Sequence, residues 1–342
     1  MSTNHRLPNN PSRRAFLYKG ALASIGILGS TPSVFDFAKS NFWTLKPDSK
    51  IKGVQIGVFT YSFRSLPSAP DKLLQYCIDS GISAIELMGD SVEDYAGKPV
   101  NTVKMPPRVA GQRPQLTDEQ KAEIAAYQKQ VAEWRASVSM DTFKTVRKMF
   151  KKAGVSIYAF KPNALGANNT DAEIEYALRA AKALGAKSVT VELPNDAAQT
   201  KRLGDLAAKH KIYIGYHAHL QATDTFWDVA LSQSPYNSMN LDCGHYIAAG
   251  GNNTKETLLA LIEAKHDRIT TMHIKDRKSK QNGGENVVWG QGDTPIKEIL
   301  SLLRDKKYNI PATIELEYDI PKDSDPVKET KKCLEYAKTM LA

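Results

Sequence analysis

The chain has 342 residues, of which 42% are hydrophobic and 24% are charged, and its formal net charge is +9. This composition is that of a globular protein with a large core, and the length suits one large domain or two average ones. Basic residues are scattered among acidic ones, which argues against a nucleic-acid-binding face. The three cysteines, Cys77, Cys243 and Cys333, are far apart and odd in number, which excludes a disulfide framework and a CxxC zinc pattern.

Residues 1–44 have the features of an export signal. The segment "SRRAFLYK" (12–19) precedes a short apolar run, "ALASIGILG" (21–29), which is too short to span a bilayer as a helix. A basic segment before a modest apolar one indicates secretion, and the arginine pair favours the twin-arginine route. The alternative is a frayed N-terminal helix. We therefore predict a periplasmic or exported protein without a stable membrane anchor. Removing this leader takes away five Lys/Arg and one acidic residue, so the net charge falls from +9 to +5.

From residue 51 onward, short β-branched segments alternate with amphipathic helices. The predicted strands lie at 54–62, 84–89, 156–163, 188–195, 212–219, 239–244, 270–276 and 312–319. Gly81, Gly154 and Gly185 stop the preceding helices, as C-cap glycines do. Thr170 and Glu173 form a predicted capping box at the start of another helix.

Eight strands that alternate with helices imply a parallel sheet, and eight in about 290 residues match an α/β fold of the (β/α)₈ TIM-barrel type. The alternative, a doubly wound sheet, lacks the glycine-rich phosphate loop expected after the first strand. Residues 90–137 form a long insertion after the second strand, irregular over 104–117 and helical over 118–134. We expect this insertion to be a lid or a partner surface on a catalytic domain of residues 45–342.

Acids and imidazoles end five consecutive predicted strands, the fourth to the eighth. In a barrel these strand ends meet at one mouth, where reactive groups lie. Side-chain alternation places His217 with His219 on one face of a strand, and Glu315 with Glu317 likewise. The full set is Glu192, His217, His219, Asp242, His245, His273, Lys275, Asp276, Glu315 and Glu317.

Burying isolated charges is costly unless the charges are paired or bind a metal ion. Taken singly, each of these residues could be a core histidine or a salt-bridge partner. Together, mixed imidazole and carboxylate ligands suit one divalent ion, Mn²⁺ or Zn²⁺ first and Co²⁺ or Fe²⁺ next, with open positions for substrate oxygens.

Several of these segments resemble a known superfamily, the xylose isomerase-like TIM barrels, which includes sugar epimerases, inosose isomerases and dehydratases, and apurinic endonucleases. "LDCGHYIAAGGN" (241–252) resembles their sixth-strand LDxxH segment. "MHIKD" (272–276) resembles the seventh-strand metal histidine, and "VVWGQGDTPI" (287–296) the GxG segment after it. "IELEYD" (314–319) resembles the eighth-strand glutamate. The resemblance covers residues 54–340 and implies the same fold.

The resemblance also implies roles for individual residues. Asp242, His273 and Glu315 would be metal ligands. The fifth strand departs from the epimerase pattern, because "GYHAH" (215–219) has histidines where sugar epimerases carry a glutamate. His217 would take that ligand position.

The acid/base role is then left to other residues. His219 would face the substrate, Glu192 would supply the missing carboxylate as metal ligand or as base, and Lys161 resembles a lysine that relatives place at the end of the third strand. The residues expected to contact substrate are His245, Lys275 and Glu317. Neither "ELMGD" (86–90) nor "FKPN" (160–163) offers the histidines of a multinuclear endonuclease site.

These features predict a metal-dependent sugar isomerase or epimerase that acts on a keto or hydroxy sugar through an enediolate. A divalent ion would acidify the C–H between a carbonyl and a hydroxyl, and a nearby base would remove the proton. One alternative is a lyase that cleaves 3-keto-glycosides. Another is a non-catalytic periplasmic sugar-binding protein. The expected partner is a small sugar rather than a nucleic acid, and a homo-oligomer is possible.

Overall fold

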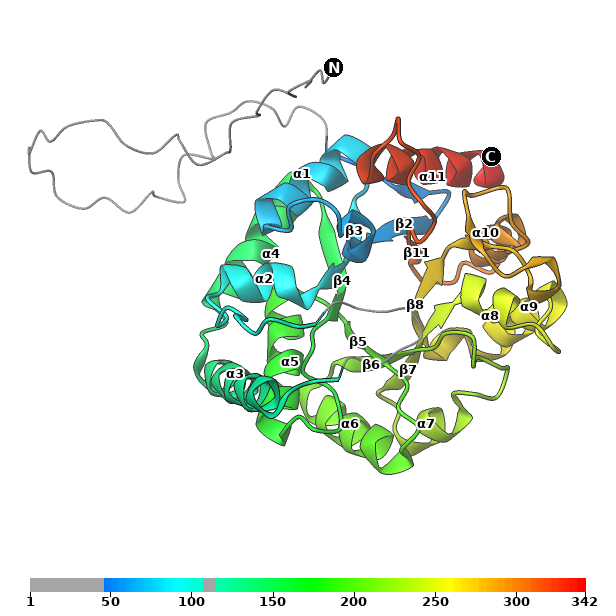
Figure 1. The fold of residues 1–342 in the computed structure, drawn as a ribbon. Helices are drawn as coiled ribbons and strands as arrows, with labels where there is room; N and C mark the ends of the chain where they lie inside the picture. Colours follow the sequence, from blue (N-terminus) through cyan, green and yellow to red (C-terminus); the bar gives the residue numbers. More distant parts are fainter. Residues whose placement is uncertain (1–45, 107–114) are drawn as a thin grey trace, which may run out of the picture. The chain divides into compact units, whose positions relative to one another are not determined.

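A computed structural model describes residues 46–106 and 115–342 of the chain (Figure 1). The predicted leader, residues 1–44, and most of the predicted irregular segment 104–117 lie outside this range. Within it, eight parallel strands form the barrel: β2 (Val54–Phe59), β3 (Ala84–Met88), β4 (Ser156–Lys161), β5 (Ser188–Glu192), β6 (Tyr213–His217), β7 (Asn237–Asp242), β8 (Ile269–Ile274) and β11 (Ala312–Ile314). Strand β2 pairs with both β3 and β11, which closes the sheet. The predicted (β/α)₈ TIM barrel is confirmed.

Helices surround the barrel as an outer layer (Figure 1). They are α1 (Pro70–Ser80), α2 (Gly89–Tyr95), α3 (Asp118–Ser137), α4 (Asp141–Ala153), α5 (Asp171–Leu184), α6 (Ala197–His210), α7 (Asp228–Gln233), α8 (Cys243–Ala249), α9 (Lys255–Lys265), α10 (Ile296–Asp305) and α11 (Pro326–Leu341). Among residues 46–106 and 115–342, none of these helices combines the length and the apolar character needed to cross a bilayer.

Several short strands and 3₁₀ helices lie outside the eight-stranded barrel. Strand β1 (Lys50–Ile51) pairs with β2 in the antiparallel direction. Strands β9 (Asp276–Arg277) and β10 (Asn286–Val287) form a two-stranded hairpin just after β8. Short 3₁₀ helices are η2 (Thr60–Phe63), η3 (His266–Arg268) and η4 (Lys280–Asn282).

Local sequence signals set several of the helix ends, as predicted. Gly81, Gly154 and Gly185 cap α1, α4 and α5 with positive φ angles of 81°, 85° and 85°. Residues with a Cβ avoid this conformation, so glycine is favoured at all three positions. Thr170 and Glu173 form both hydrogen bonds of the predicted capping box at the start of α5.

Three polar side chains, from strands β4, β8 and β11, contact one another. The Tyr158 hydroxyl lies 2.7 Å from Thr313 Oγ1, which lies 2.8 Å from Thr271 Oγ1. Gly57 leaves room for this tyrosine, because a Cβ at position 57 would lie 2.4 Å from the phenol oxygen. Apolar side chains such as Ile85 are fully buried and belong to the core.

Helix α3 is joined to the barrel by a buried ion pair. The helix extends from Asp118 to Ser137, three residues beyond the predicted 118–134 segment. Arg135 Nη1 lies 2.8 Å from Glu173 Oε1 on α5, and both side chains are buried. Arg135 Nη2 also donates to the Asn163 carbonyl at 2.8 Å. A lid or partner role for this region stays a prediction.

We expect Arg135→Met to lower the free energy of unfolding by about 2–4 kcal/mol, because it leaves the Glu173 carboxylate buried without its cation. Chemical denaturation followed by circular dichroism would measure this loss. Lys121→Met is the matched control on the same helix. Lys121 pairs with Asp118 at the surface, where such pairs contribute little. Equal stabilities of the two variants would contradict the assigned role of the buried pair.

Candidate functional site

The strand register brings the predicted polar residues together at the carboxyl end of the barrel. Asp242 on β7 is in register with His273 on β8. Glu192 on β5 is likewise in register with His217 on β6. Glu315 directly follows β11, which pairs with β8. Because neighbouring strands are about 4.8 Å apart, side chains in register on the same face are within contact distance.

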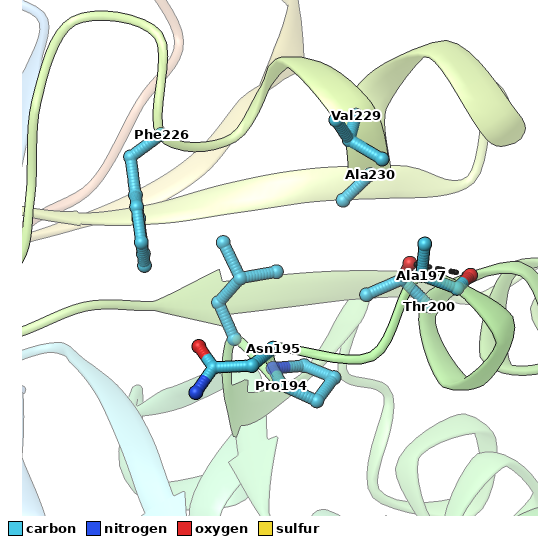
Figure 2. A pocket seen from close by; sticks show the side chains of 8 residues that line it. Pro194, Asn195, Ala197, Thr200, Phe226, Val229 and Ala230 are labelled. Carbon is cyan, nitrogen blue, oxygen red and sulfur yellow. Dashed lines mark hydrogen bonds between the residues drawn. The ribbon is translucent and has the colours of Figure 1, made fainter.

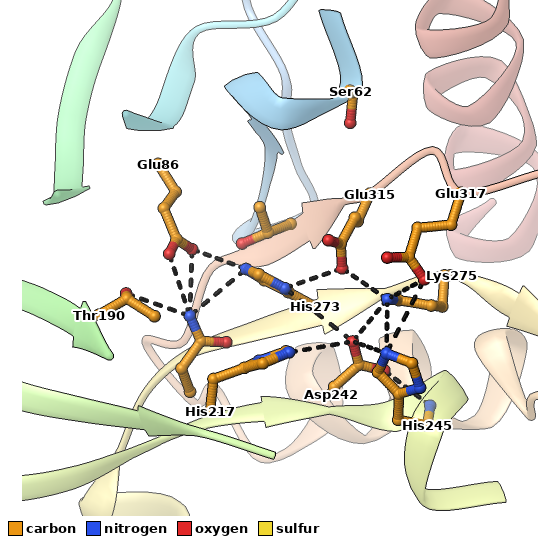
Figure 3. Close-up of polar contacts among 12 residues, drawn as sticks. Ser62, Glu86, Thr190, His217, Asp242, His245, His273, Lys275, Glu315 and Glu317 are labelled. Carbon is orange, nitrogen blue, oxygen red and sulfur yellow. Dashed lines mark hydrogen bonds and ion pairs between the residues drawn. The ribbon is translucent and has the colours of Figure 1, made fainter. Parts of the chain in front are cut away.

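The four predicted metal ligands, His217, Asp242, His273 and Glu315, form one buried cluster (Figure 3). His273 Nδ1 lies 2.9 Å from Glu315 Oε2 and 4.0 Å from Asp242 Oδ2. His217 Nε2 lies 4.0 Å from the same Asp242 oxygen. His217, Asp242 and His273 each offer a ligand atom, and these atoms all lie within 4.8 Å of one another. The structure thus brings three of the predicted ligands within reach of one ion, with Glu315 next to His273.

The chemistry of this cluster fits a divalent metal ion. Asp242 Oδ2, His273 Nδ1 and Glu315 Oε2 are buried, and their close partners are the charged groups of the cluster itself. Four ligands with metal bonds of about 2.1 Å lie roughly 3.4 Å apart, close to the separations observed. Burial, and then the charge of His273, hold the pKa of His217 well below its ordinary value. His217 is therefore neutral, which is the form that binds metal.

Lys275 supplies a positive charge inside the same cluster (Figure 3). Its Nζ lies 2.9 Å from Asp242 Oδ2, 2.8 Å from Glu315 Oε2 and 2.7 Å from Glu317 Oε2. Burial alone would lower the pKa of Lys275, but the three carboxylates outweigh it and raise the pKa above its ordinary value. Lys275 and Glu317 were predicted to contact substrate. The structure shows that they also contact each other.

Glu86 on β3 belongs to the cluster and was missed by the sequence analysis. Its Oε2 lies 2.8 Å from His273 Nε2, and Asn240 Nδ2 donates to both of its oxygens at 3.1 and 3.2 Å. His273 is thus held between two carboxylates, with Nδ1 facing the other predicted ligands. Such a carboxylate behind a metal-binding histidine fixes the orientation of its ring. The available signal was an acid within the apolar strand "AIELM" (84–88).

The two carboxylates also set the protonation of His273. Burial by itself would lower the pKa of His273, but Glu315 and Glu86 outweigh burial and raise it to about 10. In the metal-free protein this imidazole is therefore a cation that balances buried negative charge. Burial raises the pKa of Asp242, whereas Lys275 and His273 overcome burial and lower that of Glu315.

The predicted catalytic residues Lys161, Glu192 and His219 lie together at the rim of the barrel. Lys161 Nζ donates to Glu192 Oε1 at 2.8 Å, and His219 Nδ1 lies 3.5 Å from Glu192 Oε2. About half of the side-chain surface is exposed for Glu192 and for His219, at 47% and 49%. The rings of His219 and His217 are 4.9 Å apart, so this group at the rim adjoins the buried cluster.

His245 lies at the start of α8, where Asp242 has two functions. Asp242 Oδ1 accepts a hydrogen bond from the His245 backbone N–H at 2.7 Å and caps the helix, while Oδ2 faces the cluster. The His245 ring contacts Arg277 Nη1 through Nδ1 at 2.6 Å and Lys275 Nζ through Nε2 at 3.2 Å. Burial and these cations lower its pKa to about 2. His245 is neutral here, beside the site.

Asp276, the residue after Lys275, holds the loop that contains the GxG segment. Its Oδ2 accepts hydrogen bonds from the backbone N–H groups of Gly290 and Gly292, both at 2.8 Å. A Cβ at position 292 would lie 2.0 Å from Asp276 Oδ1, so the loop can approach the carboxylate only with glycine there. Asp276, the first residue of β9, therefore has a structural role.

Two surface cavities lie on the loops that follow β5, β6 and β7. The first, of about 280 Å³, is lined by Leu193, Pro194 and Asn195, directly after Glu192, and by Phe226, Val229 and Ala230 (Figure 2). The second, of about 360 Å³, is lined by residues 220–225, directly after His219, and by 249–253. None of the predicted catalytic or metal-binding residues lines either cavity.

Residues 74–339 match the family model described as "Xylose isomerase-like TIM barrel", and the chain belongs to this family. A search of curated proteins finds no match.

Solved structures share the fold at low sequence identity. A xylose isomerase domain protein from Alicyclobacillus acidocaldarius has a TM-score of 0.56 and 15% identity, covering 84% of this chain and 99% of that one. A sugar phosphate isomerase/epimerase from Parabacteroides distasonis has a TM-score of 0.53 and 17% identity, over 85% and 96% of the two chains. The 3-keto-D-glucoside 4-epimerase from E. coli has a TM-score of 0.54 and 14% identity, over 84% and 99%.

We expect Glu86→Gln to lower the pKa of His273 from about 10 toward the ordinary histidine value near 6.5, because one of its two carboxylate partners is lost. NMR titration of labelled histidine in chelator-treated protein would measure the change. Glu329→Gln, which neutralises a buried carboxylate on α11, is the control and should leave this pKa unchanged. An unaltered titration in Glu86→Gln would contradict the assigned contact.

The same pKa predicts how stability depends on pH. His273 has a higher pKa in the folded protein than in the unfolded chain, so its protonation stabilises the fold. This stabilisation is complete below about pH 6.5 and is lost as the pH rises toward 10. The metal-free protein should therefore lose unfolding free energy across this interval, and Glu86→Gln should lose less. Urea denaturation at several pH values would measure both slopes, and equal slopes would contradict the prediction.

Proposed function

We propose that this protein is a divalent-metal-dependent enzyme that isomerises or epimerises a keto or hydroxy sugar. One observation carries the proposal: ligand atoms of His217, Asp242 and His273 lie within 4.8 Å of one another at the carboxyl end of a barrel, and Glu315 Oε2 lies 2.9 Å from His273 Nδ1. A buried set of imidazole and carboxylate ligands at this spacing suits a divalent ion. The family and the sugar-isomerising structural neighbours support the same class of reaction.

The metal would be held by those four side chains. When bound, it would polarise a substrate carbonyl and the adjacent hydroxyl and so acidify the C–H between them. The imidazole of His217 is neutral and ready to bind, and Glu86 keeps Nδ1 of His273 directed at the centre. Mn²⁺ and Zn²⁺ both suit this mixed set of nitrogen and oxygen ligands.

Glu192 is the proposed base. Lys161 binds Oε1 of Glu192, and His219 lies near Oε2, so the carboxylate is positioned at the rim by two neighbours. Glu192 would take the proton from carbon. Return of the proton to the neighbouring carbon gives an isomer, whereas delivery of a proton to the opposite face of the same carbon gives an epimer.

Glu317 is the proposed second acid/base group, on the other side of the barrel. Strands β5 and β11 are four places apart in the closed ring of eight, so Glu192 and Glu317 come from opposite walls. A sugar bound between them would have a carboxylate on each face. This arrangement favours epimerisation, in which one face loses the proton and the other gains it.

A lyase that cleaves 3-keto-glycosides is the second candidate. The E. coli neighbour is a 3-keto-D-glucoside 4-epimerase, which supports a glycoside with a keto group as the substrate class. The cavity that begins at Leu193, one residue after Glu192, offers space for the group attached to such a sugar (Figure 2). We also propose export through the arginine-pair leader. An exported enzyme would meet glycosides rather than sugar phosphates, which agrees with this substrate class.

The purified protein should contain about one equivalent of Mn²⁺ or Zn²⁺ after loading and desalting, because the proposed ligands cluster at a single position. Asp242→Ala should reduce this to less than about a tenth of an equivalent, measured by mass spectrometry of the metal. Asp293→Asn is the control, since Asp293 instead binds the Ser279 backbone N–H. Equal metal content in all three proteins, or none in any of them, would contradict the proposed ligands.

Glu192→Gln should slow exchange of the substrate α-proton in D₂O by about 10²–10⁴-fold, as expected when a general base is removed. Proton NMR with a panel of keto-sugars and 3-keto-glycosides would follow the exchange. Glu175→Gln, which changes a half-buried acid on α5, is the matched control.

The outcomes of this experiment separate the candidate functions. An exchanged sugar without loss of a group indicates isomerisation or epimerisation, whereas release of the glycosidic substituent indicates the lyase. Saturable sugar binding without any exchange would indicate a non-catalytic binding protein. Full activity of Glu192→Gln would remove Glu192 as the base.

A further inference from the structure

Lys275 contacts the same carboxylate oxygens that face the proposed metal position. Its ammonium group lies 2.9 Å from Asp242 Oδ2 and 2.8 Å from Glu315 Oε2. A divalent ion bonded to these two oxygens at about 2.1 Å would be only a few ångströms from the ammonium group, where like charges repel strongly. Lysine and metal therefore compete for Asp242 and Glu315.

The surrounding chain provides a specific space for this lysine. A Cβ at Gly244 would lie 2.3 Å from Lys275 Cγ and 2.8 Å from its backbone oxygen. The glycine at this position, next to the metal-facing Asp242, therefore leaves room for the lysine stem. The side chains of Lys275 and Asp242 are almost fully buried, at 2% and 0% exposure, so solvent screens the attraction between their charges very little.

Glu317 gives the ammonium group another partner. Lys275 Nζ donates to Glu317 Oε2 at 2.7 Å, and it also lies 3.2 Å from His245 Nε2. The Glu317 side chain is 22% exposed, whereas those of Asp242 and Glu315 are 0% and 5% exposed. A small displacement of Nζ toward Glu317 would thus move the lysine charge outward without leaving it unpaired.

We propose that Lys275 is a built-in counter-ion that occupies the metal site in the metal-free protein and transfers to Glu317 when metal binds. This inference rests on the metal site of the proposed function. In the metal-free state the lysine stabilises the cluster of buried carboxylates. In the metal-bound state Glu317 and His245 hold the Lys275 ammonium group beside the site. Displacing this group lowers the net free energy of metal binding.

The proposal predicts opposite effects of two substitutions on metal affinity. Lys275→Met removes the competitor while keeping the length of the side chain, so Mn²⁺ and Zn²⁺ should bind about tenfold more tightly or better. Glu317→Gln removes the alternative partner, so the same ions should bind about tenfold more weakly. Titration calorimetry of the chelator-treated full-length protein would measure both affinities.

Thermal unfolding of the same samples provides a second measurement. Metal-free Lys275→Met should unfold at a lower temperature than the wild type, and added Mn²⁺ should raise its Tm by more. Lys98→Met is the matched control. Lys98 is also surrounded by three carboxylates, those of Asp90, Glu93 and Asp94, but lies at α2 rather than in the cluster. This control should lower the Tm without changing metal affinity.

Unchanged or weaker metal binding by Lys275→Met would overturn the proposal, as would unchanged binding by Glu317→Gln. If Lys275→Met does not fold, the affinity of Glu317→Gln decides. Metal uptake by Lys275→Met but not by the wild type would support the lysine as competitor while contradicting the metal-dependent function. No uptake by either protein would contradict both.

Discussion

The buried cluster at the mouth of the barrel depends on charge compensation. Glu86, Asp242 and Glu315 lie almost completely out of contact with solvent. Removing a carboxylate from water costs several kcal/mol unless a cation is positioned to offset it. His273 between Glu86 and Glu315, and Lys275 between Asp242 and Glu315, provide the two cations. The surrounding strands, helix α8 and the loop containing Gly290 and Gly292 must therefore lie where these charged groups can contact one another.

The barrel architecture meets this requirement through the alternation of side chains along each strand. On β8 and just beyond it, Thr271, His273 and Lys275 are two residues apart and point to the same side. Thr271 contacts Thr313, His273 contacts Glu86, and Lys275, beyond the end of β8, contacts Glu317. One strand thus links the structural base of the barrel to the exposed groups at its mouth.

Residues around the cluster combine structural and chemical roles. Asp242 caps α8 with one oxygen and faces the predicted ligands with the other. Asp276, next to Lys275, binds the backbone of the loop containing Gly290 and Gly292. The rim residues Glu192 and Glu317 are more exposed than the cluster and come from opposite walls. This division between a dry cluster that can hold an ion and an open rim that can exchange protons suits the enediolate chemistry we propose.

Much of this organisation is determined by the sequence alone. Hydrophobic periodicity and cap residues such as Gly154 and Thr170 are local signals, so the eight strands and several helix ends could be predicted. Acids and histidines at strand ends could be assigned to one mouth because parallel strands in a barrel share a direction. The four predicted ligands do lie together, although their role in metal binding stays a prediction.

Only the tertiary structure decided which of these groups touch. Glu86 and His273 are 187 residues apart, and their contact across the barrel depends on strand register and closure, which local pattern does not specify. For the same reason Lys275, which the sequence predicts to contact substrate, could not be recognised as the cation shared by three carboxylates. Residue type and alternation set which side chains enter the barrel, whereas the pairing of strands far apart in the chain sets their partners.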